Sequence, residues 1–114
     1  MCMMSQQQLL LRPELTVSQI LRVYGKQFTQ IIERYSDGHN GRCAVGVIMS
    51  YFGWNGKDDF RASKKLLRAF TALAQAGVCK DLVIQLNDSG MSFDEIADYL
   101  DQLHELSSID LVEY

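Results

Sequence analysis

The stretch GRCAVGVIM, at residues 41–49, decides the fold that we expect of this chain. It is an apolar, helix-like run that opens at a glycine turn, and one face of the helix carries Cys43 and Gly46. Small residues on a helix face let a second helix approach closely. We therefore expect a closely packed helix with small side chains on one face over residues 43–52, with Gly53 in the left-handed conformation that ends it.

Two capping boxes mark the starts of helices on either side of this run. Thr16 and Gln19 form the first, ahead of apolar residues that recur at steps of three and four as far as Tyr35. Ser92 and Glu95 form the second. Two further helical segments lie between these starts, and for the second of them a helix is favoured over a strand. The predicted helices cover residues 16–35, 43–52, 59–76, 78–86 and 93–106. The last is expected to end at Ser107 and Ser108.

The order of these segments predicts the fold class. Five helical segments with short polar connections and no alternating strand pattern indicate an all-α fold, arranged as a single orthogonal or bundle-like domain. Residues 1–12 are rich in Met and Gln, and Pro13 prevents a helix from running through them. We therefore expect a flexible N-terminal leader over residues 1–12 and one helical domain over residues 13–114.

Composition limits the class of protein. The chain has 114 residues, of which 47% are hydrophobic and 22% charged, as is typical of one soluble globular domain. Its apolar runs are far shorter than the ~20 residues of a membrane-spanning helix, and no signal peptide is recognised. Three cysteines, Cys2, Cys43 and Cys79, form no CxxC pair, so we expect free thiols, no metal site and a cytoplasmic location. Nothing in the sequence predicts a cofactor.

The charges are divided sharply along the chain. Residues 1–80 hold all eleven Lys and Arg with five acids, whereas residues 81–114 hold nine acids and no Lys or Arg. Each part supplies a helical stripe of like charge, and pairing between the stripes is the simplest explanation, ahead of solvated faces and of nucleic-acid binding. The basic stripe is Arg61, Lys64, Lys65 and Arg68, and the acidic stripe is Asp94, Asp98, Asp101 and Glu105.

Cys43 is a candidate nucleophile, because a thiol at the first turn of a helix lies at the positive end of the helix dipole. A cysteine enzyme also needs a base and an orienting group, for which His39 and either Asn87 or Asp88 are available. The favoured interpretation is structural. In it, Cys43 is a small buried residue of a closely packed helix.

The stretch LNDSG at residues 86–90 forms a second turn after an apolar run. Asn87 and Asp88 are typical of turns in which side chains bond to backbone groups left unpaired at helix ends. One carboxylate beside one amide supplies too few ligands for calcium or zinc. We therefore expect two structural elbows, one formed by Gly41, Cys43 and Gly46 and the other by Asn87 and Asp88.

Three short stretches, GRCAVGVI (41–48), VIQLND (83–88) and SFDEIA (92–97), resemble small microbial proteins of an uncharacterised helical family. That family combines a Cys-Ala-x-Gly helix with an Asn-Asp elbow. The resemblance implies that Cys43 and Asn87 meet in space, with the Asn87 amide bonded to backbone near the glycine turn that precedes the helix. It implies no known activity.

These observations favour a small cytoplasmic helical module without catalysis, which acts in regulation or through protein contacts. Its partner would be another protein or a second copy in a homodimer, and the aromatic residues Tyr51 and Trp54 are candidates for the contact surface, as is the basic stripe. Two other classes stay open. One is a cysteine-dependent hydrolase or transferase that uses Cys43, and the other is a weak nucleic-acid binder that uses the stripe from Arg61 to Arg68.

Overall fold

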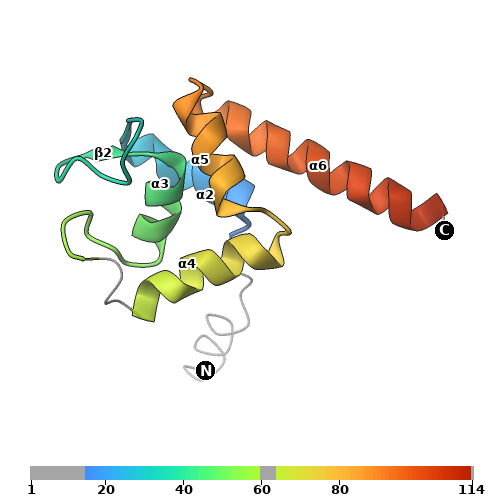
Figure 1. Ribbon diagram of the computed structural model, residues 1–114, viewed down its shortest axis with the longest axis horizontal. Helices are drawn as coiled ribbons and strands as arrows, with labels where there is room; N and C mark the ends of the chain where they lie inside the picture. Colours follow the sequence, from blue (N-terminus) through green and yellow to red (C-terminus); the bar gives the residue numbers. More distant parts are fainter. Residues whose placement is uncertain (1–14, 60–63, 114) are drawn as a thin grey trace, which may run out of the picture.

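The computed structural model describes residues 15–59 and 64–113, with side chains described at residues 15–59 and 68–103. The predicted leader at residues 1–12 lies outside them. Figure 1 shows the described elements gathered into one body, from which the end of the last helix extends. In chain order they are α2 (Val17–Val23), the 3₁₀ helix η1 (Tyr24–Gln27), β1 (Thr29–Gln30), β2 (Gly41–Arg42), α3 (Ala44–Tyr51), α4 (Lys64–Gln75), α5 (Lys80–Asp88) and α6 (Phe93–Glu113).

The predicted all-α class is confirmed in part. The described residues form five α-helices, but β1 and β2 also form a two-stranded parallel sheet. In this sheet Thr29 pairs with Gly41, and Gln30 pairs with Arg42. The fold is therefore predominantly helical, and the small sheet ties the segment after α2 to the segment that leads into α3.

The first predicted helix is wrong beyond Val23. The chain leaves α2 there and passes through η1 into β1, instead of continuing as a helix to Tyr35. From β1 onward its backbone groups bond to the segment before α3, and the N–H of Ile31 donates to the carbonyl of Arg42 at 3.0 Å. These bonds replace the bonds within a helix that the apolar spacing predicted, because distant backbone partners satisfy the same groups.

The later helices are present, and one is longer than predicted. α3 and α5 match their predicted ranges to within a few residues, so the choice of helix for α5 is confirmed. α6 continues to Glu113, and the predicted break at Ser107 and Ser108 is wrong. A serine inside a helix costs only about 0.5 kcal/mol relative to alanine, which neighbouring residues easily offset. None of the described helices combines the length and apolarity needed to cross a membrane.

The two predicted capping boxes and the left-handed glycine after α3 are confirmed. Thr16 and Gln19 form a capping box at α2, with both reciprocal bonds present. At α6 the N–H of Ser92 donates to Glu95 Oε1 at 3.0 Å, and the N–H of Glu95 donates to Ser92 Oγ at 3.1 Å. Gly53 adopts φ 110° after α3, as a left-handed helix end requires. The short polar patterns at the starts of α2 and α6 were thus more informative than the long apolar spacing.

α3 lies at the centre of the core. Every residue from 41 to 50 is buried, and α2, α4 and α5 all pack against this helix. Gly46 permits the closest approach, because a Cβ on it would fall 2.0 Å from the carbonyl oxygen of Tyr35. The large side chains that fill the core are Ile20, Leu21, Val45, Val47, Ile48, Met49, Leu73, Val83 and Ile96.

The acidic stripe of α6 has a partner that the sequence did not predict. Asp98 and Asp101 both form ion pairs with Arg22 on α2, and the Arg22 Nη1 to Asp101 Oδ2 distance is 2.8 Å. Of the basic stripe, Arg61 lies outside the described residues, as do the side chains of Lys64 and Lys65. The ion pairs that the structure describes therefore join α2 to α6.

Candidate functional site

The Asn87 amide is the central connection of the candidate site. Asn87 is 0% exposed, and its Oδ1 accepts from the N–H of Ala44 at 3.0 Å and from Gln30 Nε2 at 2.8 Å. Its Nδ2 donates to the carbonyl of Ile31 at 2.7 Å. One side chain at the end of α5 thus holds the first N–H of α3, the side chain of β1 and the turn that follows β1. The two elbows that the sequence singled out lie together in the structure.

Cys43 caps α3 as a buried thiol. It is 3% exposed, and its Sγ accepts from the N–H of Gly46 at 3.4 Å. Burial raises the pKa of the Cys43 thiol, and the nearby carboxylate of Asp88 raises it further, against the lowering effect of the Gly46 and Val45 N–H groups. The direction is opposite to that of an activated nucleophile. Cys43 is therefore mainly a neutral thiol at neutral pH.

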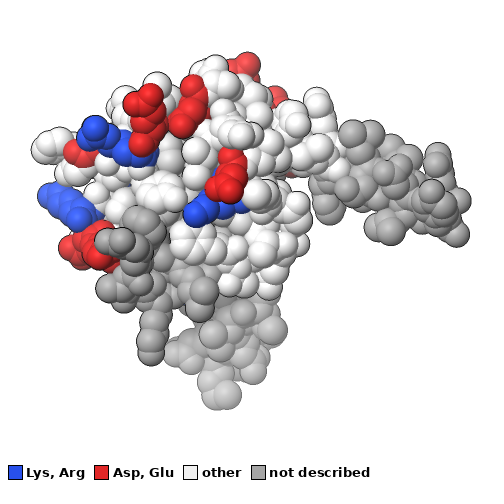
Figure 2. All heavy atoms as spheres, in the orientation of Figure 1, with Lys and Arg blue, Asp and Glu red and all other residues white. Residues whose placement is uncertain are grey.

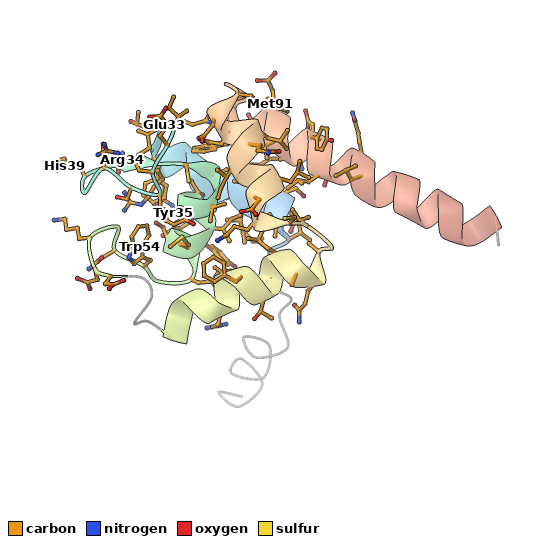
Figure 3. All side chains as sticks on the ribbon, viewed as in Figure 1. Glu33, Arg34, Tyr35, His39, Trp54 and Met91 are labelled. Atoms are coloured by element: carbon orange, nitrogen blue, oxygen red, sulfur yellow. The ribbon has the colours of Figure 1, made fainter. Side chains whose placement is uncertain are left out.

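His39 lies apart from Cys43. Figure 3 shows His39 at the outer end of the loop between β1 and β2. Its backbone N–H donates to Asp37 Oδ1 at 2.8 Å, and its backbone carbonyl accepts from Arg42. Within the described part of the chain, no hydrogen bond joins the His39 and Cys43 side chains. The structure thus brings Asn87 and Asp88 toward Cys43 but does not bring a histidine base to it.

A surface hollow of about 370 Å³ lies beside Cys43, between α5 and the turn after β1. The turn includes Glu33, which adopts φ 69°, a left-handed conformation that is uncommon for a residue other than glycine. The Glu33 N–H donates to Asp88 Oδ1 at 3.0 Å, so α5 holds this turn in place. The residues that line the hollow are Glu33, Arg34, Tyr35, Cys43, Ile84 and Asp88.

Sequence reasoning missed four of these lining residues, Glu33, Arg34, Tyr35 and Ile84, and it missed the burial of Arg42. The first three were assigned to a helix that the structure does not form, so their convergence on α5 was not visible. Arg42 is 4% exposed, and its Nε donates to Ser50 Oγ at 2.8 Å. Its other nitrogens donate to Ser36 Oγ and to the carbonyl oxygens of His39, Gly41 and Asn55.

Aromatic residues from two parts of the chain, one before β1 and one after α3, cover this arginine. The Arg42 Cζ lies 4.7 Å from the ring centroid of Phe28 and 5.8 Å from that of Trp54. Trp54 is half-buried, and its Nε1 donates to the carbonyl of Asp58 at 2.9 Å. Tyr51 is half-buried in the same cluster. Of the predicted contact residues, the aromatic ones therefore pack largely against their own chain.

The basic stripe is represented in the described side chains by Arg68. Its guanidinium carbon lies 5.4 Å from the ring centroid of Phe52, so the side chain lies over an aromatic ring of α3's end. No group of three metal-ligating side chains occurs among the described residues. Comparisons with known protein families, with curated proteins and with solved structures find no match for this chain. The function is therefore argued from the geometry of the chain itself.

The two described thiols are expected to differ in reactivity. In the folded protein at pH 8, iodoacetamide should modify exposed Cys79 at least about tenfold faster than buried Cys43, because only the thiolate reacts and access requires local opening. Peptide mass spectrometry of timed samples measures both rates. In 8 M urea the two rates should converge. Preferential modification of Cys43 at pH 6 in the folded protein would contradict the structural role and favour a cysteine enzyme.

Proposed function

We propose that this protein is a non-catalytic protein-interaction module of the cytoplasm, and that it binds a basic amphipathic segment of another protein along one face of α6. The observation that carries the proposal is an apolar pair on that face: Tyr99 is 36% exposed and Leu103 is 37% exposed. They are four positions apart and therefore lie one turn apart on the same side of the helix. Ile96 lies seven positions before Leu103 and therefore on nearly the same side of α6, but it is buried against the core, so the apolar side of α6 loses its cover between these two residues.

The charge of this region favours a basic partner. Glu95 is exposed and lies one turn before Tyr99 on the same side of α6. Residues 81–114 carry nine acids and no Lys or Arg, and Figure 2 shows acidic side chains over the end of α5 and the start of α6. Two copies that met along α6 would bring acids against acids. A partner with basic residues around an apolar stripe is therefore favoured over a second copy.

The unreactive character of Cys43 and the free thiols support two other parts of the proposal, the lack of catalysis and the cytoplasmic location. A thiol with a raised pKa and no histidine bonded to it among the described residues suits a structural role better than a nucleophilic one. Cys43 and Cys79 are free thiols, as is usual for proteins of the reducing cytoplasm.

The test uses two designed helical peptides with one leucine stripe in common, the first with lysine and the second with glutamate on the polar face. Calorimetric titration of the full chain at about 0.1 M salt should detect binding of the lysine peptide alone. The double variant Tyr99→Ser/Leu103→Ser should weaken this binding at least about tenfold, because it removes apolar area from the contact.

A matched control uses two exposed apolar residues that are not part of α6. The variant Val23→Ser/Ile32→Ser replaces side chains that are at least as exposed as those of Tyr99 and Leu103. It should leave the affinity for the lysine peptide within about twofold of that of the parent protein. Equal binding of the glutamate peptide, or an equal loss in the control variant, would overturn the proposal. If sedimentation equilibrium detects a dimer that Leu103→Ser abolishes, the molecule bound at this face is a second copy of the chain. That result would also overturn the proposal of a basic partner.

A further inference from the structure

A second hollow, of about 190 Å³, lies between the start of α2, the connection from α4 to α5, and α6. We call it the α2–α6 hollow. The polar residues that line it already bond within the fold: Ser18 Oγ donates to Asp101 Oδ1 at 2.7 Å, and Thr16 Oγ1 accepts from the N–H of Gln19 at 3.2 Å. Asp101 Oδ2 also forms an ion pair with Arg22. A polar ligand would therefore have to compete with bonds that hold α2 to α6.

The other residues that line the α2–α6 hollow are apolar. Val17 and Leu100 are buried, Val78 is half-buried and Ala76 is exposed. What these residues offer an occupant is the burial of apolar surface, so the occupant that fits is an aliphatic side chain. A cavity of ~150 Å³ holds one benzene molecule, which means that a hollow of this volume suits one or two leucine side chains.

The chain carries such side chains a short distance before the hollow. Residues 9–11 are three consecutive leucines that follow three glutamines, in the N-terminal segment outside the described residues. Leu11 lies five positions before Thr16, which itself lines the hollow. Even fully extended, this connection spans at most about 18 Å. The three leucines are therefore tethered close to an apolar hollow of matching size.

The tether favours these leucines over any separate partner. Burial of one leucine side chain favours a docked state by about tenfold to a hundredfold. Closing a connection of about five residues disfavours it by about tenfold. Docking of one leucine is therefore at least evenly balanced, and docking of two is favoured. A separate peptide with the same side chains would also have to lose its translational and rotational freedom.

We propose that the N-terminal segment of this chain folds back into the α2–α6 hollow, where leucine side chains of residues 9–11 lie on Val17, Val78 and Leu100. The contact contains no charged pair, so it changes little with salt. It is reversible, because the burial of one or two side chains only moderately exceeds the cost of closing the connection. It does not depend on the peptide binding proposed for α6, so either proposal can fail without the other.

The direct test is NMR of the full chain with ¹³C-labelled leucine and valine methyl groups. Nuclear Overhauser effects should join methyl groups of residues 9–11 to those of Val17, Val78 and Leu100. A second sample mixes labelled and unlabelled chains, which separates contacts between two chains from contacts within one. The absence of these contacts would overturn the proposal. Contacts found only between chains would also overturn it, because the occupant would then be the segment of a second copy.

Two triple variants of the N-terminal segment separate the leucines from their neighbours. The first is Leu9→Ser/Leu10→Ser/Leu11→Ser, and its matched control is Gln6→Ser/Gln7→Ser/Gln8→Ser. The leucine variant should shift the backbone amide signals of Val17, Ala76 and Val78 at least about threefold more than the glutamine variant does, because only the first removes the side chains that contact the hollow. Equal shifts in the two variants would contradict docking by the leucines.

A pair of alanine variants tests the hollow itself. Ala76→Phe places a ring at the exposed rim of the hollow and should block docking, whereas Ala74→Phe adds the same ring at an exposed position of α4 that does not line the hollow. In the Ala76→Phe background the leucine substitutions should no longer shift the signals of Val17 and Val78. In the Ala74→Phe background they should shift them as in the parent protein. The same response in both backgrounds would show that the leucines act elsewhere.

Discussion

Replacing Asn87 with alanine is expected to lower the free energy of unfolding by about 3–5 kcal/mol, a large share of the stability of a domain of this size. The change leaves the N–H of Ala44 and the carbonyl of Ile31 without their partner at a buried site. Each such loss costs about 1–3 kcal/mol. Gln30 keeps a second bond, from Nε2 to the carbonyl of Met91, and loses less. Urea unfolding at 25 °C, followed by circular dichroism, measures the effect.

A control on the same helix isolates the amide. Gln85 is exposed on α5, and Gln85→Ala should change the free energy of unfolding by less than about 0.5 kcal/mol. Asn87→Asp should be severe at pH 7, because it buries a charge and replaces the donor to Ile31 with a carboxylate oxygen. Its deficit relative to the parent should narrow as pH falls and the new carboxyl, whose folded-state pKa is raised by burial, takes up a proton. A loss below about 1 kcal/mol in Asn87→Ala would show that water replaces the amide.

The starts of α2 and α6 could be predicted from sequence because a capping box depends on neighbours in the chain. Thr16 with Gln19, and Ser92 with Glu95, form bonds within four residues of each other, so the residue types alone identify them. The length of the first helix depends instead on a contact with a distant part of the chain. Its apolar spacing continues to Tyr35, but pairing of β1 with β2 depends on a segment ten or so residues further along the chain. A two-residue strand has no periodicity of its own to reveal it.

The same division applies to the candidate site. Asn87 stood out because a small amide after an apolar run is typical of a side chain that bonds backbone groups, and it does bond them. The hollow could not be predicted, since its wall includes the turn from Glu33 to Tyr35, which the helical spacing placed elsewhere. The direction of the pKa change at Cys43 also could not be predicted from the sequence. A position at the start of a helix favours the thiolate, and only the structure shows that burial outweighs it.

Replacing Arg42 with lysine is expected to destabilise the protein by about 3 kcal/mol or more, although the charge is kept. The guanidinium is buried, and its nitrogens donate to two serine hydroxyls and three backbone carbonyls while its face lies near Phe28. The described residues place no carboxylate in an ion pair with it. A lysine ammonium presents its donors at one point and cannot reach acceptors on α3, on the loop before it and on the loop after it together.

The comparison of Arg42→Lys with Arg42→Met separates charge from hydrogen bonding. If the charge itself stabilised the fold, lysine would preserve most of the stability and methionine would not. The geometry indicates instead that the hydrogen bonds of the guanidinium, and not its charge, stabilise the fold. Both variants should lose a similar amount, because both leave the hydroxyl of Ser50 and the carbonyl of Asn55 without the donor that now joins them.

The exposed residue Arg34 provides the control, and Arg34→Lys should stay within about 0.5 kcal/mol of the parent in urea unfolding. Amide hydrogen exchange should also rise first at Asn55 and Gly56 in both Arg42 variants, because a Cβ on Gly56 would fall 2.3 Å from the guanidinium and this loop is built around it. Full stability in Arg42→Lys would contradict this account, since it would mean that one positive charge, however placed, is enough to hold the two loops against α3.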